Sequence, residues 1–116
     1  MNLGPVETLP HRTVVSLSGR LDTLGVEAIE TAFNAAVVTR RVDAIVDLSA
    51  VEFLSSMGVR MLLTAAKALQ RAGARLVLAA PGPLVDGALR HSSLAQVIRV
   101  AADRDAAAAW LDGRPS

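Results

Sequence analysis

Several residue types on which catalytic and binding sites depend are scarce in this chain. Its 116 residues include no cysteine, no tyrosine and two histidines, and aromatic residues make up 3%. The absence of cysteine excludes disulfide bonds and thiolate metal sites, as is usual for a cytoplasmic protein. So few histidines and no tyrosine leave little for general acid–base catalysis. The shortage of aromatic residues also removes the stacking platforms of single-strand nucleic-acid binders.

Clustered charge and the common catalytic motifs are missing as well. Twelve basic residues balance eleven acidic ones to a net charge of +1, whereas nucleic-acid binders usually carry a clustered basic excess. The chain contains no G-x-x-x-x-G-K-[ST], G-x-G-x-x-G, H-E-x-x-H or G-x-S-x-G. We therefore expect no cofactor, no metal site, no direct contact with nucleic acid and no enzymatic activity.

Long apolar runs are absent too, although the chain is rich in hydrophobic residues. No run reaches the length of a membrane span, and the first residues lack the basic start and apolar stretch of a secretory signal. A hydrophobic fraction of 52% in 116 residues is enough for one well-packed core. We expect a single cytoplasmic domain over residues 1–116, with its core at about 13–111 and a mobile polar tail at 113–116.

Short β-branched segments alternate with segments of helical period. The expected strands cover residues 13–18, 44–48, 75–80 and 97–100, with a short edge strand at 3–9 that Pro5 and Pro10 limit. The expected helices follow Asp22 or Thr23, Ser56, Pro83 and Asp103. This alternation predicts an α/β domain with parallel strand pairs.

Residues at the helix ends carry further expectations. The pair Arg40-Arg41 is suited to the negative end of the first helix, and Gly73 to the position just after the second. Trp110 is predicted to anchor the last helix in the core. We expect His91 and the pair at 92–93 to be structural or exposed.

The most informative stretch is EFLSSMGVR (52–60), where two adjacent serines stand between a strand and a helix. One interpretation is plain helix capping, in which a serine oxygen accepts a free N–H of the first turn. The other is a modification site, because a helix N-terminus accommodates a phosphate well and phosphorylation adds about −1.5 to −2 charges. Gly58 would serve either close backbone access or helix packing.

The helix after Ser56 has a basic face. Ser56, Arg60, Thr64, Lys67 and Arg71 recur every three or four residues, opposite the leucines. An ordinary solvated face and a partner-binding face both fit this pattern. Asp22 follows the preceding strand in the same way that Ser56 follows the next. Because such loops share the carboxyl edge of a sheet, we expect Asp22 to lie near Ser56, either as a helix cap or as part of a site.

These segments together resemble the STAS family, which includes the bacterial anti-sigma factor antagonists. The resemblance rests on GRLD (19–22), on DLS (47–49) and on FLSSMGV (53–59), in this order within alternating strands and helices. It spans about residues 14–111 and implies an α/β fold with a mixed β-sheet of four to five strands and about four helices.

The resemblance implies a non-enzymatic protein that binds an anti-sigma factor serine kinase and thereby frees a sigma factor. The kinase would phosphorylate Ser56, or with less support Ser55, and a metal-dependent serine phosphatase would reverse the reaction. The expected partner-binding residues are Asp22, Ser55, Ser56, Met57, Gly58, Arg60, Thr64, Lys67 and Arg71.

The chain departs from the family pattern at Ser55, where many members carry aspartate, and at Met57, which is bulkier than the usual small residue. Two other functions therefore stay open. One is a STAS module that acts without phosphorylation in a transport or sensory complex. The other is a domain that binds a small ligand or nucleotide between the two loops.

Overall fold

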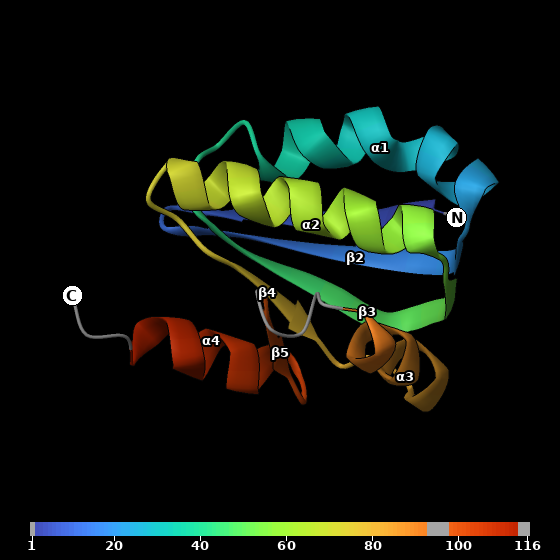
Figure 1. Cartoon of the computed structure of the whole chain (residues 1–116). Helices are drawn as coiled ribbons and strands as arrows, with labels where there is room; N and C mark the ends of the chain where they lie inside the picture. The colour runs from blue at the N-terminus through green and yellow to red at the C-terminus, as the bar shows by residue number, and fades with distance from the viewer. Residues whose placement is uncertain (1, 93–97, 114–116) are drawn as a thin grey trace.

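The computed structural model describes residues 2–92 and 98–113 of the chain. At its centre is a five-stranded sheet whose strands lie in chain order. The first two strands are antiparallel and the other neighbouring pairs are parallel, so the sheet is mixed (Figure 1). The strands are β1 (Asn2–Leu9), β2 (Arg12–Leu21), β3 (Asp43–Leu54), β4 (Leu76–Ala79) and β5 (Arg99–Ala101).

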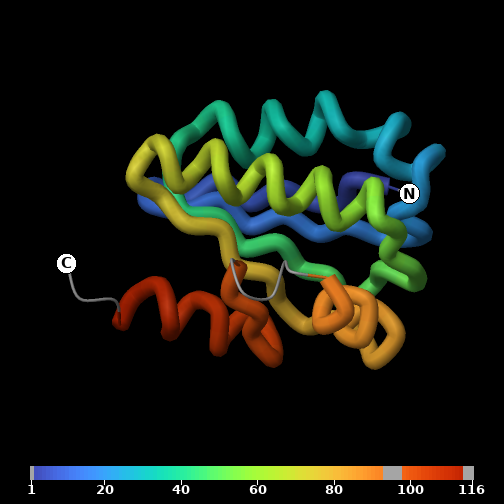
Figure 2. The backbone as a smooth tube through the Cα atoms, in the orientation of Figure 1, coloured from blue at the N-terminus to red at the C-terminus, as the bar shows by residue number. Residues whose placement is uncertain are grey.

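Four helices accompany the strands in the described part of the chain. They are α1 (Thr23–Val37), α2 (Ser56–Arg71), α3 (Pro83–His91) and α4 (Arg104–Asp112). α1 and α2 lie side by side on one face of the sheet, and α4 lies on the opposite face (Figure 1 and Figure 2). The predicted α/β fold with a mixed sheet is thus confirmed. None of the helices within 2–92 and 98–113 is long and apolar enough to cross a membrane.

Alternation along the central strands divides the core into two clusters. Val15 and Val46 point towards α1 and α2 and belong to the main cluster, which also holds Phe33 and Leu62. Their chain neighbours point to the other face, because successive side chains of a strand alternate. There they form a second cluster under α4, made of Val14, Ile45, Val77, Ala79, Ala101, Ala107 and Leu111. The sheet is therefore covered on both faces, but very unequally.

Two helices begin at residues that the sequence predicts as caps. The Asp22 carboxylate accepts a hydrogen bond from the Gly25 amide at 2.9 Å, and that of Asp103 accepts one from the Ala106 amide at 2.7 Å. Ser55 caps α2. Gly73, with φ +82°, follows the end of α2 in the left-handed conformation that favours glycine. These boundaries follow local rules, so the sequence predicts them well.

The expectation that Arg40 and Arg41 close the first helix is wrong. α1 ends at Val37, with no basic residue in its last turn. The Arg40 guanidinium instead donates to the backbone carbonyls of Leu9, at 2.7 Å, and Arg12, at 3.0 Å. It therefore stabilises the turn between β1 and β2, a tertiary contact that helix-end statistics do not anticipate.

Other elements differ in extent from the expectation. β3 continues to Leu54 because its second half pairs with the end of β2, with register shifts near Gly19. The last strand begins at Arg99; Val97, its predicted start, and residues 114–116 of the predicted mobile tail lie outside the described residues. Trp110 is only half-buried, so the predicted core anchor is partly corrected. Its ring lies under two cations, with the Arg75 guanidinium 4.0 Å and the Arg99 guanidinium 5.3 Å from the ring centroid.

Candidate functional site

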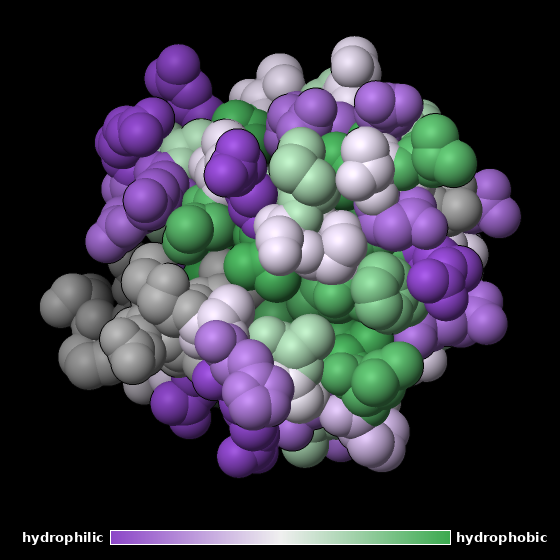
Figure 3. Space-filling model, turned by 45° about the vertical axis from the view of Figure 1, so that its right-hand side comes forward, coloured by the Kyte–Doolittle hydropathy of each residue, from purple (hydrophilic) through white to green (hydrophobic). Residues whose placement is uncertain are grey.

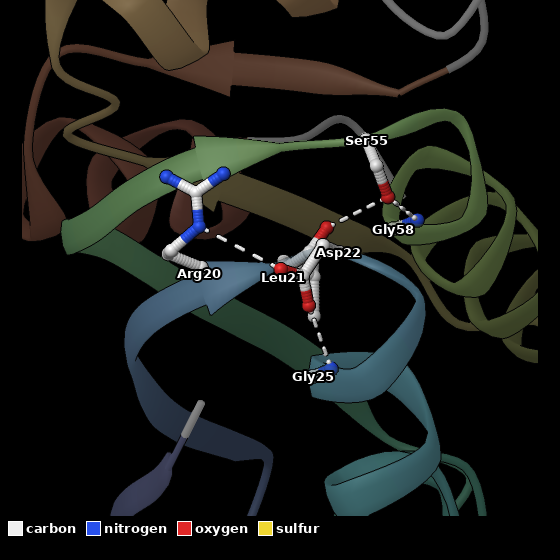
Figure 4. Close-up of polar contacts among 6 residues, drawn as sticks. All are labelled: Arg20, Leu21, Asp22, Gly25, Ser55 and Gly58. Atoms are coloured by element: carbon white, nitrogen blue, oxygen red, sulfur yellow. Dashed lines mark hydrogen bonds and ion pairs between the residues drawn. The ribbon is translucent and has the colours of Figure 1, made fainter.

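The site is built where the β2–α1 and β3–α2 junctions meet at the carboxyl edge of the sheet. The backbone carbonyl of Leu21 accepts two hydrogen bonds from Ser55. One comes from the hydroxyl at 2.9 Å (Figure 4) and the other from the amide at 3.0 Å. The same hydroxyl accepts a hydrogen bond from the Gly58 amide at 3.2 Å. Ser55 thus joins the end of β2 to the first turn of α2.

The structure separates the roles of the two serines. Ser55 has extended backbone angles and caps α2, so its hydroxyl is engaged both as donor and as acceptor. Ser56 is the first helical residue and is exposed. Within the described residues its hydroxyl has no hydrogen-bond partner. Capping is therefore the role of Ser55, and Ser56 is the serine that another molecule can reach without breaking a structural contact.

Gly58 lies against the end of β2 and is buried. A Cβ atom added there would lie 2.7 Å from the Leu21 carbonyl oxygen, 2.8 Å from Leu21 Cγ and 2.9 Å from Leu54 Cδ1. Real Cβ atoms almost never approach other atoms so closely, so only glycine fits without a shift of the backbone. Of the two expected roles for Gly58, the structure favours helix packing, which sets the position of Ser56.

Asp22 belongs to the same corner of the molecule, next to Leu21. Its carboxylate caps α1 and lies 3.6 Å from Arg20 Nε (Figure 4). The hydrogen bond from the Gly25 amide lowers the pKa of Asp22, and the nearby Arg20 acts in the same direction. Asp22 is therefore an anion, and it directly follows Leu21, whose carbonyl accepts the hydrogen bonds of Ser55. The two loops meet at one edge of the sheet, as expected.

The basic face of α2 is exposed along its whole length. Ser56, Arg60, Thr64, Lys67 and Arg71 are all accessible, and Met57 is 40% exposed. Among the residues that the structure describes, none of the three cations on this face forms an ion pair. Of the expected partner-binding residues, those within α2 are exposed except for the buried Gly58, while Ser55 is half-buried and the half-buried Asp22 lies apart, at the start of α1.

A shallow groove beside the serines was not expected from the sequence. It has a volume of about 340 Å³ and is lined by Leu54, Ser55, Ser56, Val59, Ala88, His91 and Ser92. His91 and Ser92 lie at the end of α3 and were expected to be structural or exposed. No local pattern could have placed them here, because they reach the groove only through the tertiary position of α3, which contacts β3.

No metal-binding cluster accompanies this surface within residues 2–92 and 98–113. In the described ranges, no three carboxylate or histidine side chains cluster closely enough to hold a metal ion. The carboxylate of Asp47 is directed elsewhere, with Arg104 Nε 2.6 Å from its Oδ2. The arrangement is an accessible hydroxyl at a helix N-terminus, flanked by cations and by a shallow groove.

The model of the STAS domain family matches residues 5–107, and the chain belongs to this family. Among curated proteins, it is 30% identical over 96 residues to BtrV of Bordetella bronchiseptica, which carries the name of an anti-sigma factor antagonist; the match covers 83% of each chain.

Solved structures of similar proteins share the fold over nearly their whole length. An anti-sigma factor antagonist from Mycobacterium paratuberculosis is 28% identical, with a TM-score of 0.85 and coverage of 96% of this chain and 93% of that one. The phosphorylated form of the Bacillus cell fate determinant SpoIIAA is 23% identical, with a TM-score of 0.69 and coverage of 95% and 99%.

Proposed function

We propose that this protein is a cytoplasmic anti-sigma factor antagonist that binds an anti-sigma serine kinase and is released when the kinase phosphorylates Ser56. A metal-dependent serine phosphatase restores the binding form. The protein acts by binding and does not itself catalyse a reaction. The observation that carries the proposal is that Ser55 caps α2, whereas Ser56 is exposed beside it.

The geometry of Ser56 suits reversible phosphorylation. At the first position of a 16-residue helix, a phosphate is favoured by the helix dipole and by free amide groups. Because the hydroxyl makes no protein contact among the described residues, its modification disrupts no contact of the fold. The added charge must be desolvated if a partner covers it, so the complex is weakened.

The serine at position 55 is compatible with this switch. Many family members have aspartate there, and aspartate and serine cap helices about equally well. Ser55 keeps the cap and also donates to the Leu21 carbonyl, which an ionised aspartate cannot do. The departure from the family pattern therefore changes the charge beside Ser56 and leaves the corner intact.

The similar proteins support the same function. BtrV and the Mycobacterium protein are named as anti-sigma factor antagonists, and SpoIIAA has been solved in a phosphorylated form. The exposed cations of α2 offer a contact surface beside the phosphorylation site, from Arg60 to Arg71.

The proposal is tested by phosphate transfer and binding with the anti-sigma kinase isolated from the source cells. After incubation with kinase and ATP, intact-mass measurement should show one phosphate on the wild type and none on Ser56→Ala. Ser56→Ala should bind the kinase as tightly as the wild type, and Ser56→Asp more weakly. Ser55→Ala is the matched control: it should still accept phosphate but should lose about 1 kcal/mol of stability with the cap.

Equal phosphate uptake by the wild type and by Ser56→Ala would contradict the assignment of Ser56. Tight binding without any phosphate transfer would instead favour a STAS module that works in an assembly. Melting curves recorded with ATP, GTP and lipids address the ligand-binding alternative, since a ligand that binds only the folded state raises the melting temperature.

A further inference from the structure

Three helices begin at the carboxyl edge of the sheet, and each carries a large hydrophobic residue at its second position. These residues are Leu24 in α1, Met57 in α2 and Leu84 in α3, and we call them the apolar edge. Their exposed fractions are 76%, 40% and 67%, and Leu24 and Leu84 are the most exposed large hydrophobic residues in the described ranges. Figure 3 brings this end of the molecule forward and shows hydrophobic side chains gathered on it.

Folding does not account for these side chains. Leu24 and Leu84 gain little from burial, which is the usual reason for a leucine in a domain. The first turn of a helix is also the position where acidic residues are most favourable, yet the first turns of α1 and α2 contain none. Scattered exposed leucines are normal, whereas apolar residues that gather at one end of a domain indicate a contact surface.

The apolar edge and Ser56 belong to one surface. Ser56 directly precedes Met57, and the double hydrogen bond from Ser55 to the Leu21 carbonyl fixes the start of α2 against the end of β2, three residues before Leu24. On the other side, the groove lined by Val59 and Ala88 connects the start of α2 with α3. A partner that covers Ser56 therefore meets apolar side chains on both sides.

We propose that Leu24, Met57 and Leu84 are the apolar anchors of the contact with the anti-sigma kinase, whose docking surface has an apolar centre and an acidic margin. This inference rests on the proposed function and adds to it two residues, Leu24 and Leu84, that lie outside the expected binding set. It also defines the chemistry of the partner's surface.

Charge complementarity identifies the margin of that surface as acidic. Arg60 is exposed one turn along α2 from Ser56 and forms no ion pair in the described ranges. Arg20 stacks 4.4 Å over the Phe53 ring near the start of α1, but its charge is partly balanced by the Asp22 carboxylate 3.6 Å away. Arg60 is therefore the cation beside the apolar edge that is available to attract a carboxylate of the partner. A phosphate on Ser56 places about two negative charges between these anchors. The same acidic partner is then repelled, which gives the release that the switch requires.

The test compares exposed apolar residues inside and outside the apolar edge in the Ser56→Ala background, so that phosphorylation cannot dissociate the complex. Leu24→Ser and Leu84→Ser should each weaken binding to the kinase about tenfold or more, as expected of apolar anchors. Val6→Ser and Leu9→Ser are the controls, because these residues of β1 are 41% and 40% exposed but lie outside the apolar edge. Kd is measured by surface plasmon resonance, with melting temperatures to confirm folding.

Affinities of Leu24→Ser and Leu84→Ser within twofold of the β1 controls would overturn the inference and leave the proposed function standing. Absence of kinase binding by the wild type and by Ser56→Ala would overturn both. Sedimentation analysis of the free protein tests whether a second copy of the chain occupies this surface instead. A dimer that dissociates on Leu24→Ser or Leu84→Ser would show this, and would also contradict the proposal.

Discussion

The two faces of the sheet are held by different kinds of interaction. Under α1 and α2, large side chains such as Phe33, Leu62 and Leu69 are fully buried in one continuous cluster. Under α4, three alanines make up much of a small cluster. There, ion pairs from Arg104 to Asp47 and from Arg12 to Asp112 add to the attachment.

One face of the sheet is therefore stabilised mainly by apolar burial, whereas ion pairs contribute more to the other. The sheet face covered by α1 and α2, next to the candidate site, is stabilised mainly by buried apolar area, which salt and pH barely affect. The α4 face depends more on partly exposed ion pairs, which salt screens. We therefore expect α4 to be the element that separates first under mild perturbation, while the Ser55–Ser56 corner stays folded.

The largest expected effect is the loss of a leucine from each face. Leu62→Ala removes a fully buried side chain of α2 and should lower the free energy of unfolding by about 3–5 kcal/mol. Leu111→Ala, in α4, should cost less, about 2 kcal/mol, because the smaller cluster can close over the vacated space. Urea unfolding followed by circular dichroism gives both values, and equal losses would remove the proposed difference between the faces.

Breaking the ion pair between Asp47 and Arg104 should have the next largest effect on the free energy of unfolding. Asp47→Asn leaves Arg104 without its carboxylate and should cost about 1–2 kcal/mol, reduced from the value of a buried pair because 44% of the Arg104 side chain is exposed. Trp110, the sole tryptophan, reports on α4 by fluorescence. The matched control is Asp86→Asn, which breaks the exposed pair with Arg90 in α3 and should leave the Trp110 signal unchanged.

Acid should destabilise the α4 face more than the face under α1 and α2, because the Asp47 carboxylate becomes protonated. Burial acts to raise the pKa of Asp47, but hydrogen bonds from the Ser49 amide and from Arg104 outweigh it, so the pKa lies below the ordinary value of 3.8. Because the folded pKa is lowered, this stabilisation is fully present above the ordinary pKa. It is lost as the pH falls from there through the folded pKa.

Wild-type stability should consequently fall more steeply below about pH 4 than that of Asp47→Asn. Asp22, whose pKa is also lowered, is unchanged in both proteins and contributes equally to each curve. Unfolding measured by Trp110 fluorescence at a series of pH values tests this. Parallel stability curves for the two proteins would show that Asp47 does not supply the pH dependence.

The smallest effect is expected at the far end of α4. Asp112→Asn should cost about 0.5 kcal/mol, since the Asp112 side chain is 69% exposed and such pairs contribute little. Raising sodium chloride should accelerate amide hydrogen exchange in α4 more than in α2, because salt screens the ion pairs and not the apolar contacts. Uniform acceleration across both helices would indicate that charge does not distinguish the faces.

The local parts of this structure could be predicted from the sequence. Asp22 and Asp103 each stand directly before a helical segment and cap it, and the apolar centres of the strands mark the sheet. The resemblance at residues 53–59 located the exposed serine. Phosphorylation of Ser56 and the binding roles of its neighbours stay predictions.

The remaining features depend on contacts distant in sequence. Arg40 binds carbonyls about 30 residues earlier in the chain, which no helix-end rule anticipates. The second half of β3 contains Ser49 and Glu52 and is a strand because β2 lies beside it. His91 lines the groove beside the serines only because of where α3 lies against β3.

The Leu21 carbonyl, with two hydrogen bonds from one serine, has a consequence for how fast the proposed complex would form and separate. A corner held by these bonds and by the close approach of Gly58 is preorganised, so binding has little conformational entropy to lose there. Under the proposed function, the kinase would therefore meet the same corner before and after phosphorylation of Ser56. The two forms should associate at similar rates at high ionic strength, and the discrimination should lie in the lifetime of the complex.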